Sequence, residues 1–262
     1  MGVLMRSCLR IPGLTTMHQA RPKPLWHTGA SRPTGASVTQ PATVPMKIDF
    51  VSDVSCPWCV IGLKALEQAL ERVGPLVDAQ LHFQPFELNP RMGQGGQEIN
   101  EHLQQKYGST PEQLAQTREH IRARGAELGF EFGLGKRSRV YNTFDAHRLL
   151  HWAGQQDEVN GGGRRQWALK QALFSAYFTE GENPGSHEVL VRAAEQVGLD
   201  PTQAGEVLES GRYADEVRQL QQFYQGQGIH AVPAIIINDR HLISGGQPPE
   251  VFEQALRQIA AA

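Results

Sequence analysis

The stretch that decides the fold runs from Met46 to Leu70 and reads MKIDFVSDVSCPWCVIGLKALEQAL. Polar and apolar residues alternate in its first part, as far as Val51, and this alternation is typical of a half-buried β-strand. In its second part the apolar residues recur at helical spacing, which predicts a helix from about Pro57 to Val73. The motif Cys56-Pro57-Trp58-Cys59 therefore lies where a strand passes into a helix.

The start of this helix decides the chemistry of the two cysteines. Proline suits the first helical position, because its fixed φ fits there and the N–H that it lacks would be unpaired anyway. Pro57 in that position places Cys56 at the N-cap, where backbone N–H groups and the helix dipole stabilise a thiolate. Cys59 follows one turn later, within reach of a mixed disulfide on Cys56. We predict that Cys56 is the nucleophile and Cys59 the resolving residue.

Two other interpretations of the C-x-x-C motif fit less well. A structural zinc site needs four ligands, usually from a second pair of similar spacing. The only other cysteine is Cys8, far away in the chain, so we predict no metal. A purely structural disulfide is disfavoured, because so short a loop constrains the unfolded chain little. The strand-to-helix context instead favours a thioredoxin-like redox motif.

Composition limits the classes of function. With 262 residues, 40% hydrophobic and 20% charged, the chain is long enough for one large or two smaller globular domains. Five of its 25 basic residues and none of its 27 acidic residues lie in 1–45, which leaves a net charge of −7 for 46–262. This acidic body argues against nucleic acid as a partner, and no apolar run is long enough for a membrane span. Since the body has only two cysteines, we expect a cytoplasmic rather than a secreted, disulfide-rich protein.

Residues 1–45 form a separate segment. They mix Pro, Thr, Ser, Gly and Arg without periodicity, so we expect them to be disordered and outside the fold. Their basic, acid-free composition is also typical of an organellar transit peptide. A third interpretation makes Met46 the working start, with an upstream extension before it.

The remaining chain predicts one sheet domain interrupted by helices. A second strand is expected over 79–88, and residues 98–227 carry almost entirely helical patterns. Strand character returns at 234–237, followed by a two-residue turn at Asn238-Asp239 and a last helix that ends near Ala261. We therefore expect a sheet domain formed by 46–92 and 228–262, with a helical domain inserted over 93–227.

Several segments resemble the DsbA-like branch of the thioredoxin superfamily, and most closely its FrnE-like disulfide oxidoreductases. The resemblance covers about 47–260 and rests on Ser55-Cys56-Pro57-Trp58-Cys59, Asn142-Thr143 with Ala146-His147-Arg148-Leu149, Ala231-Val232-Pro233, and Ser244-Gly245-Gly246-Gln247-Pro248-Pro249. It implies an α/β, thioredoxin-like fold with a large all-helical domain inserted between the second and third strands. It also implies a cis bond before Pro233, beside the reactive sulfur, with the Val232 backbone free to pair with an extended substrate chain.

Five further side chains are weaker candidates. Asp53 is either the proton acceptor of Cys59 or a turn residue, and Trp58 is expected to shape the surface around Cys56, in contact with substrate. His147 and His151 are four apart on a helix and could share a metal, but no third ligand accompanies them, so packing is the better interpretation. Gln247 precedes the last helix, where related glutathione-binding proteins hold a carboxylate of the peptide.

These observations predict a thiol–disulfide oxidoreductase that acts on protein or peptide thiols and disulfides through Cys56 and Cys59. Apart from this redox-active pair it needs no cofactor, with glutathione or a thioredoxin-type reductant as the expected co-substrate. The first alternative is a glutathione-dependent isomerase or transferase of the kappa or 2-hydroxychromene-2-carboxylate isomerase type. Such enzymes usually carry serine where this chain has Cys56. The second alternative is a non-catalytic binding module that uses the helical domain.

Overall fold

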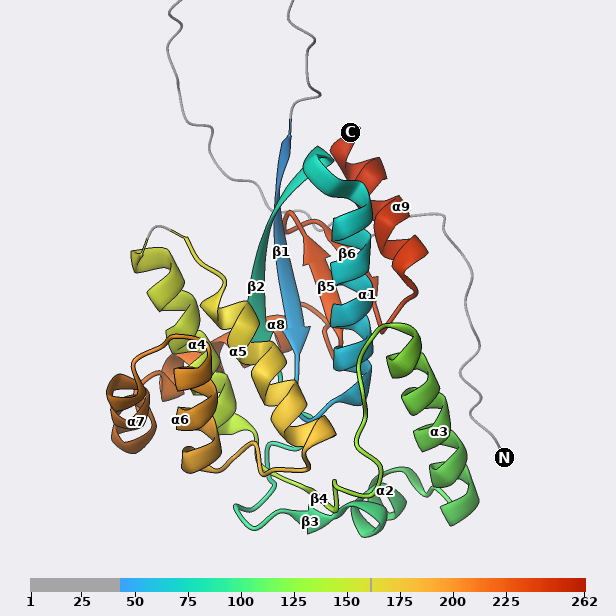
Figure 1. Ribbon diagram of the computed structural model, residues 1–262, viewed down its shortest axis with the longest axis vertical. Coiled ribbons are helices and arrows are strands. Elements are labelled where there is room, and N and C mark those ends of the chain that lie inside the picture. Colours follow the sequence, from blue (N-terminus) through green and yellow to red (C-terminus); the bar gives the residue numbers. More distant parts are fainter. Residues whose placement is uncertain (1–42, 161) are drawn as a thin grey trace, which may run out of the picture.

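The centre of the molecule is a four-stranded sheet. A computed structural model describes residues 43–160 and 162–262, and its strands lie in the order β2-β1-β5-β6 (Figure 1). They are β1 (Val44–Ser52), β2 (Val77–Pro85), β5 (Ala234–Ile237) and β6 (His241–Ser244). β1 and β2 are parallel, whereas β5 runs antiparallel to both β1 and β6. Two segments far apart in the sequence thus build one sheet, as expected.

One face of the sheet is covered by α1 (Pro57–Val73) and α9 (Pro249–Ala260), which lie side by side (Figure 1). Ile48 and Phe50 point from β1 into this layer, where they join a fully buried cluster with Leu66 of α1 and Phe252 of α9. Burial of each such side chain stabilises the fold by roughly 1.5–3 kcal/mol. This cluster holds the first turn of α1 against the end of β1.

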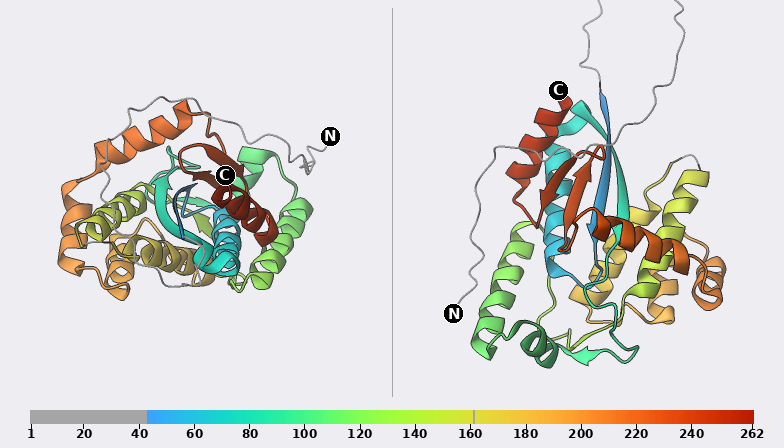
Figure 2. Two further views of the ribbon diagram at one scale, coloured as in Figure 1. Left: turned by 90° about the horizontal axis from the view of Figure 1, so that it is seen from above. Right: turned by 180° about the vertical axis from the view of Figure 1, so that it is seen from behind.

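The opposite face of the sheet is covered by α8 (Ala214–Gly226), as the view from behind shows (Figure 2). Tyr224 of α8 packs with Val51 of β1 and Ile236 of β5 in a second buried cluster. The expected division of the chain put this helix in the insertion, within 93–227. Although α8 lies between β2 and β5 in the sequence, it packs on the sheet, because the alternating side chains of β1 have two apolar faces and α8 covers the second.

The inserted segment packs against one edge of the sheet, and part of it lies beyond the end of α1 (Figure 1). Its elements are β3 (Gln97–Glu98), α2 (Ile99–Tyr107), α3 (Pro111–Glu127), β4 (Arg139–Val140), α4 (Phe144–Val159), α5 (Arg165–Phe174), a π-helical turn (Ser175–Thr179), α6 (His187–Gln196) and α7 (Pro201–Ser210). The insertion is helical as expected, apart from a short antiparallel ribbon in which β3 and β4 pair. Two residues per strand are too few to show strand periodicity in a sequence.

Two strand boundaries also differ from expectation. β1 begins at Val44, where Val44 and Pro45 align with the start of β2, so the separate segment cannot extend to residue 45. The rest of that expected segment, residues 1–42, lies outside the described residues. β2 ends at Pro85 rather than at Leu88, because the backbone N–H of Leu88 donates to the Asp53 carboxylate instead of continuing the strand.

The side chain of Gln166 hydrogen-bonds the insertion to the free edge of β2. Gln166 of α5 is buried, and its amide both accepts from the backbone N–H of Phe83 and donates to the Phe83 carbonyl, at 3.0 and 3.3 Å. An edge strand normally presents such groups to solvent. Gln166 therefore bonds backbone groups of β2 that a further strand would otherwise pair with, and it fixes α5 against the sheet.

Candidate active site

The two cysteines lie where the sequence places them. Cys56 is the N-cap of α1, Pro57 is its first residue, and Cys59 lies in its first turn. Cys56 is 4% exposed and Cys59 is 0% exposed, and both are free thiols. Burial, and then the neighbouring Cys56, raise the pKa of Cys59 well above its usual value. A buried thiol beside a more accessible one is the arrangement that a nucleophile and its resolving partner require.

The loop before β5 lies directly against Cys56. Its Val232–Pro233 peptide bond is cis, as the resemblance implies, and the Cys56 thiol donates to the Val232 carbonyl oxygen with Sγ and O 3.7 Å apart. This contact joins residues 176 positions apart in the sequence. On the other side of the loop, the Pro233 ring packs against Gly62 of α1. Helix α1 and the Val232–Pro233 loop thus form one surface around the Cys56 sulfur.

Trp58 and Gly246 extend this surface. Trp58 is half-buried and its ring lies 5.7 Å from that of His120 in α3, at a tilted angle. Gly246 approaches α1 so closely that a Cβ there would meet the Trp58 carbonyl oxygen at 3.0 Å. Gln247, the next residue, donates from its side chain to the Ser244 carbonyl at 2.8 Å. The structure therefore brings Trp58, Val232 and Pro233 together at Cys56 and places Gln247 on the adjacent loop.

Asp53 is a fully buried anchor behind the motif. Its two carboxylate oxygens accept from the backbone N–H groups of Ser55, at 3.0 Å, and Leu88, at 2.7 Å. His147 of α4 faces it, with Nε2 3.7 Å from a carboxylate oxygen. Burial alone would raise the pKa of Asp53, but His147 and the two backbone N–H groups outweigh it and hold the pKa below its usual value. Asp53 thus fits the turn interpretation better than that of a proton acceptor.

His147 and His151 make different contacts. His147 is buried beside Asp53, whereas His151 stacks on Tyr213 and pairs with Gln155. Across 43–160 and 162–262, no group of three or more His, Cys, Asp or Glu side chains is arranged to hold a metal ion. The packing interpretation of the two histidines fits these contacts.

Three cationic side chains near the cysteines were not among the candidates from the sequence. Lys106 of α2 and Arg137 of the loop before β4 both interact electrostatically with Cys56. Arg137 lies over the Tyr177 ring, 5.1 Å from its centroid. Lys170 of α5 is completely buried, and burial lowers its pKa to about 8 against the raising influence of Cys59, Asp53 and Cys56. A charged residue in an amphipathic helix normally indicates a solvated face, so the sequence does not mark Lys106 or Lys170 as a candidate.

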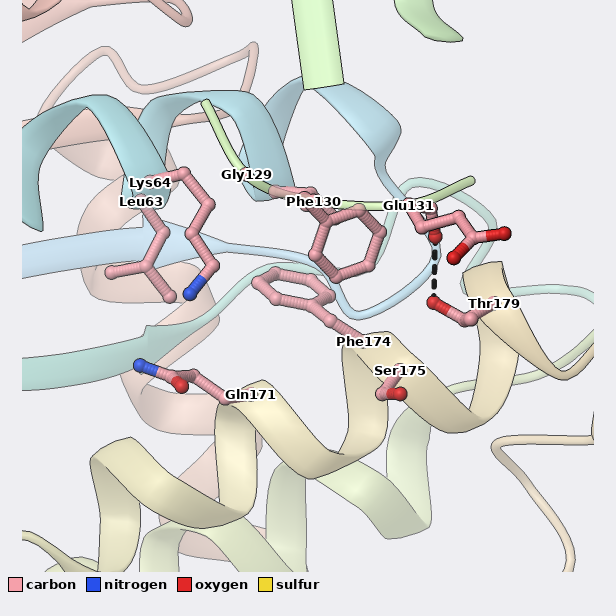
Figure 3. A pocket seen from close by; sticks show the side chains of 10 residues that line it. Leu63, Lys64, Gly129, Phe130, Glu131, Gln171, Phe174, Ser175 and Thr179 are labelled. Atoms are coloured by element: carbon pink, nitrogen blue, oxygen red, sulfur yellow. Dashed lines mark hydrogen bonds between the residues drawn. The ribbon is translucent and has the colours of Figure 1, made fainter. Parts of the chain in front are cut away.

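A cavity of about 270 Å³ lies beside α1, between that helix and the insertion. Figure 3 shows the Phe130 and Phe174 rings next to each other in it, with the Lys64 side chain reaching in from α1. Thr179 of the π-helical turn closes one side by donating to the Glu131 carbonyl at 2.7 Å. Neither cysteine lines this cavity, so the candidate site is the surface that Cys56 forms with the Val232–Pro233 loop.

A thioredoxin-like sheet with a C-x-x-C at the start of its first helix and a cis-proline loop against the first cysteine defines a thioredoxin-superfamily protein. The DSBA-like thioredoxin domain matches this chain over residues 47–257, and the chain belongs to that family. The Bacillus subtilis protein YwbO is 30% identical over 215 residues, which cover 82% of this chain and 96% of YwbO. The narrower likeness to FrnE-like proteins stays a prediction.

Solved structures agree with the family. A probable DsbA oxidoreductase from Streptomyces coelicolor has a TM-score of 0.72 and 32% identity, covering 81% of this chain and 89% of its own. The cytosolic disulfide reductase DsbM from Pseudomonas aeruginosa, in a structure with GSH, has a TM-score of 0.56 and 17% identity, covering 82% and 100%. At that identity the likeness to DsbM shows the shared fold alone.

The different burial of the two thiols leads to a first prediction. At about pH 6, iodoacetamide should alkylate Cys56 at least about tenfold faster than Cys59, because Cys59 is fully buried and its burial opposes thiolate formation. Peptide mass mapping of the reduced, native protein would report each site separately and distinguish both from Cys8. Equal rates at Cys56 and Cys59 would contradict the assignment of nucleophile and resolving residue.

Proposed function

We propose that this protein is a thiol–disulfide oxidoreductase that exchanges disulfides with protein or peptide substrates through Cys56 and Cys59. The observation that carries the proposal is the contact between the Cys56 thiol and the Val232 carbonyl, with Cys59 buried one turn behind. A substrate that approaches Cys56 must lie along the Val232 backbone. Exposed backbone groups of this kind recognise extended peptides by β-strand addition.

The reaction proceeds in two exchanges. The Cys56 thiolate attacks one sulfur of a substrate disulfide, so that a Cys56–substrate S–S bond forms and the other substrate sulfur leaves as a thiolate. Cys59 then attacks the Cys56 sulfur, which forms the Cys56–Cys59 disulfide and releases the second substrate sulfur. The substrate gains two electrons and the cysteine pair loses two. In the opposite direction, the oxidised pair accepts two electrons from a substrate dithiol.

Two assays test this function against its rivals. The reduced protein should reduce the disulfides of insulin catalytically when a reductant regenerates it, and it should show no glutathione conjugation or isomerisation beyond the uncatalysed rate. Conjugation or isomerisation without insulin reduction would favour the glutathione-dependent isomerase or transferase. Absence of both activities would favour the non-catalytic binding module.

The physiological partners follow from the same proposal. We expect glutathione or a thioredoxin-type protein to re-reduce the Cys56–Cys59 disulfide, and DsbM, which shares the fold, is described with GSH. Gln247, on the loop beside Trp58, is the side chain proposed to contact the glutathione or peptide backbone. Among the described residues, no helix combines the length and apolar character that crossing a bilayer requires. The cytoplasmic location expected from composition stays a prediction.

The contact between Gly62 and Pro233 leads to a second prediction. A Cβ at Gly62 would lie 2.9 Å from Cγ of the Pro233 ring, which cannot move away as a flexible side chain would. Gly62→Ala should therefore displace the Val232–Pro233 loop from Cys56 and lower insulin reduction by at least about tenfold, since small misplacements at a reacting centre have large effects.

Gly205→Ala in α7 is the matched control, because nothing lies within 4 Å of a Cβ there. That variant should keep full activity and should be as stable as the parent or slightly more so, because alanine favours a helix over glycine. If Gly62→Ala retained the activity of Gly205→Ala, the Val232–Pro233 loop would not form part of the substrate surface.

A further inference from the structure

A second cavity, of about 810 Å³, lies between α8, the first turns of α4 and α6, and the loop that follows β2. Helices α4 and α8 pack against each other and are seen together in the view from behind (Figure 2). Small-molecule sites have volumes of about 300–1,000 Å³, so this cavity is large enough for one. The described residues that line it include neither cysteine and neither Val232 nor Pro233. The cavity is therefore separate from the surface around Cys56.

The wall formed by α8 is bonded to two of its neighbours. Gln221 of α8 donates from its amide to Oε2 of Glu87, in the loop after β2, at 3.2 Å. Arg218 lies over the ring of Phe144, the first residue of α4, with 4.8 Å between the guanidinium carbon and the ring centroid. Positions 218 and 221 share one face of α8 and are roughly 5 Å apart. Glu87 and Arg218 therefore contribute neighbouring parts of the lining.

Two other polar side chains of the lining are already engaged. One oxygen of Asp145 accepts from Arg148 at 2.6 Å, and the other pairs with His187 at 2.8 Å, which joins α4 to α6. Both ends of the Asn142 amide bond to backbone groups, at 3.0 and 2.9 Å. These contacts hold the walls together and leave Asp145 and Asn142 without a free group for a ligand.

The carboxylate of Glu87 has unused hydrogen-bonding capacity. Its Oε2 accepts from Gln221, whereas its Oε1 is buried and has no hydrogen-bond partner among the described residues. An ionised carboxylate can accept several hydrogen bonds, and buried polar groups in folded proteins nearly always have a partner. A ligand beside Glu87 should therefore supply a donor. An ammonium suits this position best, because hydrogen bonds between two charged groups are the strongest.

Arg218 supplies the opposite charge. In the described parts of the chain, the only carboxylate within 4 Å of its guanidinium is that of Asp215, at 3.6 Å and with a side chain that is 86% exposed. So exposed a pair contributes little. Glu87 and Arg218 thus line one cavity without pairing with each other. The edge of the guanidinium stays available, and its planar fork fits a carboxylate in bidentate fashion.

We propose that this cavity binds an apolar α-amino acid, whose ammonium donates to the Glu87 carboxylate and whose carboxylate pairs with Arg218. Two opposite charges that do not meet each other are complementary to a zwitterion, whereas a simple cation or a simple anion satisfies only one of them. An α-amino acid carries its charges a few bonds apart, which suits neighbouring parts of the lining. Pro90, Met92 and the Phe144 ring provide apolar surface for its side chain. This inference goes beyond thiol–disulfide exchange and depends on neither cysteine.

The test uses the whole protein with L-leucine as the probe. Isothermal titration calorimetry should show saturable binding of one leucine per chain, with a dissociation constant below about 10 mM. Two analogues keep one charge each: 4-methylpentanoate lacks the ammonium, and 3-methylbutylamine lacks the carboxylate. Each should bind at least about tenfold more weakly than leucine, because each leaves one charged group without its partner. No leucine binding below about 10 mM, or binding no tighter than that of the analogues, would overturn the proposal.

Glu87→Gln and Arg218→Gln test the two charges one at a time, and each should weaken leucine binding at least about tenfold. In Glu87→Gln the advantage of leucine over 4-methylpentanoate should disappear, because the ammonium has lost its partner. In Arg218→Gln the advantage of leucine over 3-methylbutylamine should disappear for the corresponding reason. A residue that only supports the fold would weaken all three ligands alike, and that result would contradict the assigned contacts.

The matched controls are Glu119→Gln and Arg122→Gln on α3. These two residues form an exposed ion pair, at 2.6 Å, and neither of them lines the cavity. The substitutions make the same chemical changes as those at Glu87 and Arg218, and leucine binding should match that of the parent. Equal weakening by the α3 variants would show that the net charge of the protein, and not the cavity, controls binding.

A measurement on the parent protein keeps the proposal testable if a variant fails to fold. Backbone amide signals recorded by NMR should shift with leucine in the first turns of α4 and α6 and around Arg218. Signals around Cys56 should stay in place. Shifts confined to the surface around Cys56 would overturn the proposal. A parent that binds leucine in the cavity but does not reduce insulin would refute the proposed thiol–disulfide exchange alone, and the converse result would refute the amino-acid site alone.

Discussion

Replacement of Cys56 by serine is expected to abolish disulfide exchange, with a loss of at least about 10³-fold in insulin reduction. The nucleophile in this chemistry is a thiolate, and a serine hydroxyl is not ionised near neutral pH. Serine is close to cysteine in size, and its hydroxyl can donate to the Val232 carbonyl as the Cys56 thiol does. The melting temperature should therefore stay within a few degrees, which separates lost chemistry from lost structure.

Replacement of Cys59 by serine is expected to have a different outcome. Cys56 can still attack a substrate, but no thiol follows to release it, so mixed disulfides should accumulate. They would be visible on a non-reducing gel and would disappear on addition of reductant. If Cys59→Ser turned over insulin as fast as the parent without trapped species, the resolving role of Cys59 would be refuted. Trapped species in both cysteine variants would instead point to Cys8 as a reactive residue.

The parts of the fold set by local chemistry could be predicted from the sequence. Pro57 defines the first turn of α1, and the helix occupies Pro57–Val73 as expected. Asn238 and Asp239 lie in the predicted hairpin turn, with φ of 52° and 56°, because these residues tolerate the left-handed region that a tight hairpin requires. At such positions a few neighbouring residues determine the backbone conformation, so the local sequence predicts it.

The contacts between distant segments could be predicted only through the resemblance. Nothing near Val232 in the sequence indicates that its carbonyl meets Cys56. The position of α8 on the far face of the sheet depends on which surface of β1 lacks a cover. The burial of Lys170 also could not be predicted, since it follows from how α5 docks on α1 and β2. Sequence periodicity describes one element at a time and does not say where that element packs.

The loop held by Asp53 should contribute strongly to stability. Asp53→Ala removes the acceptors of two backbone N–H groups, those of Ser55 and Leu88, and a buried donor left without a partner costs about 1–3 kcal/mol. The free energy of unfolding should fall by roughly 3 kcal/mol. For a domain of this size, that corresponds to a decrease in melting temperature of about 6–12 °C. Urea unfolding at neutral pH would measure the change directly.

Asp53→Asn is the matched control and should lose less, because its amide oxygen can still accept one of the two N–H groups. The pH dependence adds an independent test. The folded pKa of Asp53 lies below its usual value of 3.8, so the ionised carboxylate stabilises the fold above about pH 4, and this contribution is lost as the pH falls through the lower, folded pKa. The difference in stability between the parent and Asp53→Asn should therefore be full at neutral pH and shrink on acidification below about pH 4. A difference that is constant across this range, or a parent that unfolds together with Asp53→Ala at neutral pH, would show that the carboxylate does not anchor the loop behind Cys56.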